Sequence, residues 1–131
     1  MNHTEILIRI AAAIEAQTYL EIGTRNTGDN FDLIPVTGER VGVDPQAGAD
    51  IGKDRKLMRM TSDDFFAGNK RTFDLVFVDG DHSHEQSARD MDNALGCLNA
   101  GGVIVMHDSL PASAAEALDV HYQAISRVIF E

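Results

Sequence analysis

Apolar and polar positions follow two recurring patterns along the chain, one typical of strands and one typical of helices. Short apolar runs, most of them ended by a polar residue or a glycine, predict five strands: 18–22, 40–44, 56–60, 73–78 and 103–106. The segments between and beside these strands are predicted to be helices, either because their apolar residues recur at helical spacing or because they begin with polar residues that can cap a helix. These segments are 4–16, 28–33, a helix starting at 61–64, 84–98 and 112–128.

Strand and helix therefore alternate five times, which is typical of an α/β fold. We expect a doubly wound parallel Rossmann-like sheet with right-handed crossovers, shorter than seven strands. The run Phe73–Val78 is almost continuously apolar, as in a strand buried on both faces. Thr4 is the expected N-cap of the first helix, and 46–54 is expected to be a loop. No linker or repeat divides the chain, so residues 1–131 are expected to form one domain.

The charge of the chain limits its partners. Eleven basic residues stand against 21 acidic ones, for a net charge of -10. Such a chain repels phosphate backbones, so nucleic acid is not an expected partner, whereas a cationic ligand suits it. The N-terminal segment indicates an amphipathic helix, not a signal peptide or membrane span, and we expect a cytoplasmic protein. The single cysteine, Cys97, is expected to be a buried apolar side chain.

Polar residues cluster where the predicted strands end. In parallel sheets, ligands bind beyond the carboxyl ends of the strands, near the point where strand order reverses. The acidic, histidine, serine and glycine residues at these ends are Glu21, Gly23, Asp44, Ser62, Asp63, Asp79, Asp81, His82, His107 and Asp108. Their convergence on one edge predicts a binding site there.

The first loop, from Glu21 to Gly28, limits the kinds of ligand that the site could bind. Gly23 and Gly28 allow a tight turn and the close approach of a ligand to the backbone. The dinucleotide pattern G-x-G-x-x-G is absent, and Asp29 stands where a P-loop has lysine. A ligand without phosphates is therefore favoured. Asp44, about twenty residues on, is positioned to accept hydrogen bonds from a ribose diol, the alternative being a solvated turn aspartate.

Five blocks carry a resemblance to a known family. They are LEIG at 20–23, GVDP at 42–45, TSDDFF at 61–66, FDLVFVDGDH at 73–82 and GGVIVMHD at 101–108. Together they resemble class I S-adenosylmethionine-dependent methyltransferases, over roughly residues 18–111. The similarity is greatest to the branch with V-D-G-x-H and G-G-V-I-V-x-H-D motifs.

The resemblance implies roles for these residues. Glu21 and Gly23 would line the methionine and ribose region of S-adenosylmethionine, and Asp44 would hold the ribose hydroxyls. Ser62 and Asp63 would flank the adenine. Two departures from the family pattern stand out. Arg25 and Thr27 occupy places where further glycines are usual, and the sequence holds one helix after the last predicted strand, where relatives usually add two strands.

Catalytic and metal-binding roles follow from the same resemblance. Asp79 would lie beside the reaction site, and His82 is the candidate general base. His84 is expected to have a surface or capping role instead. Some related O-methyltransferases hold a divalent metal, which here would take Asp79, His107 and Asp108; the alternative is a structural role for His107 and Asp108.

The function that these expectations describe is methyl transfer from S-adenosylmethionine to an oxygen, or less favourably a nitrogen, of a small molecule or sugar. The alternative is a non-catalytic module that binds the cofactor or a partner. An edge strand left exposed by a short sheet would be covered by a second subunit, giving a homodimer.

Overall fold

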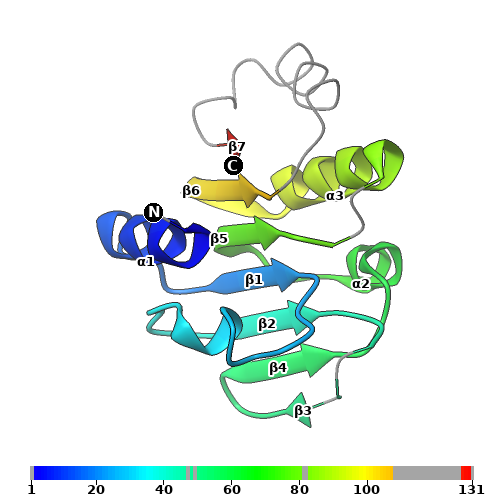
Figure 1. Ribbon diagram of the computed structural model, residues 1–131, viewed down its shortest axis with the longest axis horizontal. Helices are drawn as coiled ribbons and strands as arrows, with labels where there is room; N and C mark the ends of the chain where they lie inside the picture. Colours follow the sequence, from blue (N-terminus) through cyan, green and yellow to red (C-terminus); the bar gives the residue numbers. More distant parts are fainter. Residues whose placement is uncertain (1, 47, 49, 81–82, 108–127, 131) are drawn as a thin grey trace.

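A single mixed sheet forms the centre of the computed structural model, which describes residues 2–46, 48, 50–80, 83–107 and 128–130 (Figure 1). Its strand order is β3-β4-β2-β1-β5-β6-β7. The strands are β1 (Tyr19–Ile22), β2 (Arg40–Val43), β3 (Asp50–Ile51), β4 (Arg55–Met58), β5 (Phe73–Val78), β6 (Leu98–Met106) and β7 (Val128–Phe130). The helices are α1 (His3–Ala13), the 3-10 helix η1 (Phe31–Leu33), α2 (Ser62–Gly68) and α3 (His84–Gly96).

The order of the strands reverses at β1. This strand pairs in parallel with β2 on one side and with β5 on the other. The chain first moves outward from β1 to β2 and β4, then returns to β5 and continues to β6 and β7. Such a reversal leaves a crevice at the carboxyl ends of β1, β2 and β5.

Alternating side chains of the sheet supply two apolar cores. One face carries Tyr19, Leu75, Phe77 and Val105, which pack under α1 and the segment around η1. The opposite face packs against α2 and α3 through a second cluster, whose sheet residues include Leu20, Ile22, Val76, Val78 and Ile104. Burial on both faces explains why β5 is nearly continuous in apolar residues. The doubly wound architecture expected from the sequence is confirmed.

Side-chain caps fix where the helices begin. Thr61 accepts a 3.1 Å hydrogen bond from the Asp64 N–H and begins α2, as predicted. Ser83 caps α3 in the same way. The prediction for α1 is wrong by two residues, because the side chain of Asn2, not Thr4, accepts from the Glu5 N–H at 2.9 Å.

Other predictions are corrected by the structure. The helix expected over 28–33 is only the short η1, since the preceding residues form turns through Asn26. The expected loop over 46–54 contains β3, which pairs antiparallel with β4. β6 begins at Leu98, not at 103, because a register shift opposite Phe73–Leu75 accommodates the glycine pair.

The described residues thus contain seven strands where five were expected. β7 occupies 128–130, whereas a helix was predicted to extend to 128; the rest of that predicted helix, 112–127, lies outside the described residues. No helix in the described part of the chain is long and apolar enough to cross a membrane.

Candidate functional site

A cavity of about 820 Å³ lies at the carboxyl ends of the central strands. It brings together five of the residues predicted from the sequence: Glu21, Gly23, Asp44, Ser62 and Asp79. They come from β1, β2, α2 and β5, which confirms that the strand ends converge at the reversal of strand order.

Gly23 joins the ends of three strands. Its N–H donates to the Val43 carbonyl at 2.7 Å, while the Asp79 N–H donates to the Ile22 carbonyl at 2.8 Å. Its φ is +96°, and a Cβ at this position would lie 2.0 Å from the Asp79 carbonyl oxygen. Only glycine combines a favourable positive φ with the absence of a Cβ that would clash here. The glycine therefore allows the close approach of one strand end to another, and this contact shapes the floor of the cavity.

The carboxylate of Glu21 anchors the loop that follows β1. Its Oε1 accepts from the Tyr19 hydroxyl at 2.7 Å and from the amide of Asn30, and its Oε2 accepts from the Thr24 hydroxyl at 2.7 Å. Asn30 also donates to the Tyr19 hydroxyl oxygen at 3.0 Å. All four side chains are buried. Glu21 thus lines the cavity, and its oxygens serve first to hold residues 24–30 in place.

Burial sets the protonation behaviour of this network. Desolvation raises the pKa of Glu21 above its ordinary value of 4.5, and the hydrogen bonds from Tyr19, Thr24 and Asn30 offset part of that rise. The nearby Asp79 carboxylate raises the pKa further. Burial likewise raises the pKa of Tyr19 well above 10.0, so its hydroxyl stays a donor.

Asp44 lies directly after β2 and is 6% exposed. Its Oδ1 accepts a 2.7 Å hydrogen bond from the Gln46 N–H, which fixes the turn at Pro45. Among the described residues, no donor reaches its second carboxylate oxygen. One oxygen of a fixed carboxylate therefore remains for a ligand in the cavity.

A polar network joins α2 and α3 beside the cavity. The Gln86 amide nitrogen lies 3.2 Å from Ser62 Oγ, 3.1 Å from Asp63 Oδ1 and 3.0 Å from Asp90 Oδ1. Ser62 and Gln86 line the cavity. Asp63 is exposed and faces Arg89 instead; the hydrogen bond from Gln86 and then that from Arg89 lower its pKa. Ser62 therefore belongs to the cavity wall, and Asp63 supports it from outside.

The remaining predicted site residues lie elsewhere. Gly28 is in a turn closed by its N–H and Asn26 Oδ1, and neither it nor His107 is among the residues that line the cavity. His82 and Asp108 lie outside the described residues. Within the described residues, no group of three or more His, Cys, Asp or Glu side chains is arranged to hold a metal.

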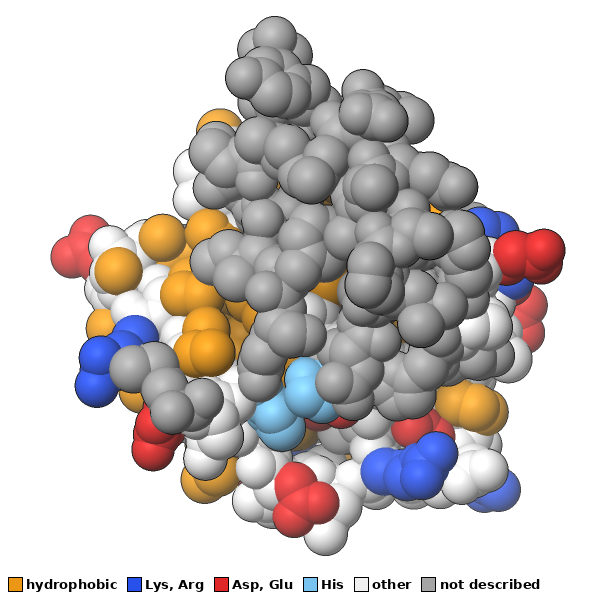
Figure 2. Space-filling model, turned by 45° about the horizontal axis from the view of Figure 1, so that its top comes forward, with side chains coloured by type: hydrophobic (Ala, Val, Ile, Leu, Met, Phe, Trp, Pro, Cys, Tyr) orange, Lys and Arg blue, Asp and Glu red, His pale blue; other side chains and the backbone are white. Residues whose placement is uncertain are grey.

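Several residues that line the cavity are missing from the sequence-based set, and two of them, Asn30 and His3, bring polar side chains from outside the strand ends. Asn30 lies nine residues beyond Glu21, at the end of a loop that shows no motif. His3 comes from the first turn of α1, and its ring stacks on Phe77 with centroids 5.3 Å apart. Only packing of α1 over the sheet brings His3 here, and no local pattern signals that. Figure 2 shows histidine side chains gathered on this face of the molecule.

Comparison with known proteins identifies the family. A family model described as a methyltransferase domain matches residues 28–109. The chain belongs to this methyltransferase family. The match agrees with the class I S-adenosylmethionine-dependent methyltransferases that the sequence motifs resemble, and that prediction is confirmed. A comparison with curated proteins finds no match.

A solved structure supports the assignment of the fold. An O-methyltransferase from Bacillus cereus, crystallised in complex with SAH, is similar at a TM-score of 0.56 and 18% sequence identity. The similarity covers 77% of this chain and 53% of the other, so this methyltransferase domain spans about half the length of that structure. At this identity, the similarity shows a shared fold.

Proposed function

We propose that this chain binds S-adenosylmethionine in the cavity and transfers its methyl group to an oxygen of a small molecule or sugar, with a nitrogen as the second choice. The observation that carries the proposal is the position of Asp44. Its buried carboxylate ends β2, lines the cavity and keeps one oxygen without a donor among the described residues. A ribose hydroxyl is a suitable donor to that oxygen.

The charges around the cavity support a cationic, phosphate-free cofactor. Its lining includes four carboxylates and one guanidinium: Glu21, Asp29, Asp44, Asp79 and Arg25. Carboxylates stabilise a nearby sulfonium and repel phosphate. Burial raises the pKa of Glu21, so a cation in the cavity offsets part of the cost of ionising it.

When bound, S-adenosylmethionine supplies an electrophilic methyl group. The residues of the chain align the reactants. In this proposal Gly23 and the anchored loop 24–30 shape the floor, Asp44 fixes the ribose, and Ser62 flanks the adenine; Gly23, Asp44 and Ser62 all line the cavity. Gly28, outside the lining, contributes only through the turn it closes, and we place Asp63 in support of Ser62. Asp79 lies in the lining beside Glu21, and His82 stays the predicted general base.

A divalent metal at Asp79, His107 and Asp108 stays a prediction. Asp79 and His107 follow the register partners Val78 and Met106 on neighbouring strands, so they lie at the same level of the sheet. The described residues supply these two groups and no third, and Asp108 lies outside them. Calorimetric titration of the chain and S-adenosylmethionine with Mg²⁺ and Mn²⁺ tests the prediction, and no heat with either would refute it.

Calorimetric titration with S-adenosylmethionine and with S-adenosylhomocysteine tests the main proposal. We expect both to bind and a nicotinamide dinucleotide not to bind. If neither compound binds, both the methyltransferase hypothesis and the hypothesis of a non-catalytic cofactor-binding module are refuted. A module that binds another partner would then remain. Binding without turnover on hydroxyl and amine compounds would favour the non-catalytic module.

A further inference from the structure

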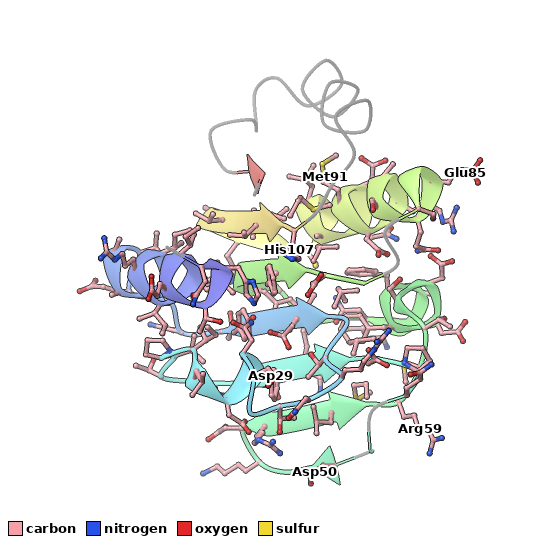
Figure 3. All side chains as sticks on the ribbon, viewed as in Figure 1. Asp29, Asp50, Arg59, Glu85, Met91 and His107 are labelled. Carbon is pink, nitrogen blue, oxygen red and sulfur yellow. The ribbon has the colours of Figure 1, made fainter. Side chains whose placement is uncertain are left out.

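The N-terminal end of α1 forms one wall of the cavity. His3 is half-buried in the first helical turn and lines the cavity together with Phe77. The two rings stack with an interplanar angle of 20°. The ring of His107 is tilted against His3, with centroids 4.9 Å apart, and Figure 3 shows His107 next to this end of α1. Phe77 is only 1% exposed, so His3 presents the accessible ring of this wall.

The strand order places this wall opposite the ribose site. Asp44 follows β2 and Ser62 begins α2, which follows β4, so both lie on the same side of β1. Phe77 lies on β5, across β1, where it is the register partner of Glu21. If Asp44 holds the ribose and Ser62 lies at the adenine, the methyl-bearing sulfur points across β1 toward β5. The methyl acceptor must then approach from the side of Phe77 and His3.

We propose that His3 is a methyl-acceptor-binding residue, and that the acceptor is an uncharged planar ring bearing a hydroxyl group. This inference rests on the proposed function. An imidazole offers a flat face on which a planar ring stacks, and the hydroxyl supplies the oxygen that the proposed transfer methylates. The carboxylates of the cavity, Glu21, Asp29, Asp44 and Asp79, disfavour an acceptor that carries its own negative charge.

The transfer step that this arrangement serves is a displacement at carbon. The acceptor oxygen forms a bond to the methyl carbon, the carbon–sulfur bond breaks, and its electron pair stays on sulfur, which leaves as a neutral thioether. The hydroxyl proton passes to water. Stacking against His3 holds the acceptor ring so that its oxygen faces the methyl group.

The test uses phenol as the probe and the full chain saturated with S-adenosylhomocysteine. Carbon-edited NMR spectra of the histidine rings follow the titration, and the His3 variants identify the His3 signal. We expect phenol to shift that signal, and His3→Ala to weaken phenol binding by about tenfold. 4-Hydroxybenzoate, which adds a carboxylate, should bind more weakly than phenol.

Two further variants separate the contributions of His3. His3→Phe keeps a flat ring in place of the imidazole, so phenol affinity should stay within about threefold of the wild type. Arg9→Gln, on the exposed side of α1, is the matched control and should leave phenol affinity unchanged. Affinity for S-adenosylhomocysteine should stay within about twofold in all three variants, because His3 lies across β1 from the ribose site.

The outcomes separate this inference from the function on which it rests. A wild-type chain that does not bind S-adenosylhomocysteine refutes both. If S-adenosylhomocysteine binds, an unshifted His3 signal, or equal phenol affinity in His3→Ala, overturns the role of His3 and leaves the cofactor site standing. Tighter binding of 4-hydroxybenzoate than of phenol overturns the uncharged class of acceptor.

Discussion

The hydroxyl of Tyr19 donates a 2.7 Å hydrogen bond to Oε1 of Glu21, two residues further along the same strand. Residues two apart on a strand point to the same face, so both side chains lie in the layer under α1 and η1. Thr24 and Asn30 complete the set of donors to Glu21. The motif that this part of the sequence resembles carries further glycines in this loop. Here Arg25 and Thr27 stand in those places, and side-chain hydrogen bonds to one buried carboxylate hold the loop.

Tyr19→Phe should lower the free energy of unfolding by about 1 to 3 kcal/mol, because a donor to a buried carboxylate is lost. Urea denaturation followed by circular dichroism measures the change. The same substitution in a Glu21→Gln background should cost less, since the acceptor is then neutral. Equal costs in the two backgrounds would show that the hydroxyl does not act through Glu21.

Glu21→Gln should change how stability depends on pH. Burial raises the pKa of Glu21 in the folded chain above its ordinary value of 4.5. The folded state therefore binds this proton more tightly than the unfolded state, and the wild type loses stability as pH rises from about 4.5 through the raised pKa. Above that pKa the loss is constant. Between pH 4 and pH 8, the unfolding free energy of the wild type should therefore fall relative to that of Glu21→Gln as the pH rises. A flat difference would contradict the burial of an ionisable carboxylate.

Gly23→Ala should destabilise the fold by more than about 2 kcal/mol, since a positive φ and a backbone clash combine. The added Cβ would meet the Asp79 carbonyl oxygen at 2.0 Å. Gly96→Ala is the matched control: nothing lies within 4 Å of its Cβ, and alanine favours the helix. Thermal unfolding of both variants gives the comparison, with Gly96→Ala expected to melt at or above the wild-type temperature.

Two carboxylates of the predicted cofactor site should differ in their effect on cofactor affinity. Asp44→Ala should weaken S-adenosylhomocysteine binding by roughly tenfold or more, because a hydrogen bond to a charged acceptor is lost. Asp63→Asn should bind it within about twofold of the wild type, since Asp63 is exposed and outside the lining. Calorimetric titration measures both. Unchanged affinity in Asp44→Ala would remove the ribose assignment.

The sequence predicts the parts of the fold that depend on burial over several residues. β5 and the capped start of α2 were predicted from such patterns, and the polar strand ends that meet at the cavity follow from parallel topology. β3 was missed because two residues carry no periodicity. The early start of β6 was missed because Gly101 and Gly102 predict a break, whereas the partner strand accommodates them through a register shift.

The candidate site was predictable only where it is built from strand ends. Gly23, Asp44 and Asp79 directly follow strands, Glu21 lies near the end of one, and Ser62 begins the helix after one, so counting along the sequence finds them. Asn30 and His3 reach the cavity through tertiary packing of η1 and α1, and no spacing rule connects them to the strands. Asp63 shows the reverse error: it directly follows Ser62 in the motif, yet points away from the cavity toward α3.

The central position of β1 has a consequence for the order in which the chain folds. Tyr19 pairs with Arg40 on one side and with Leu75 on the other, so β1 is completed by a strand made much later. Loop closure over such a distance is slow, and domains fold as their segments leave the ribosome. During synthesis, β1, β2 and β4 can associate early. The apolar face of α1 that covers β5 in the folded chain stays exposed until β5 is made. Pulse-labelled nascent chains should therefore gain protease resistance only after Met106 has emerged.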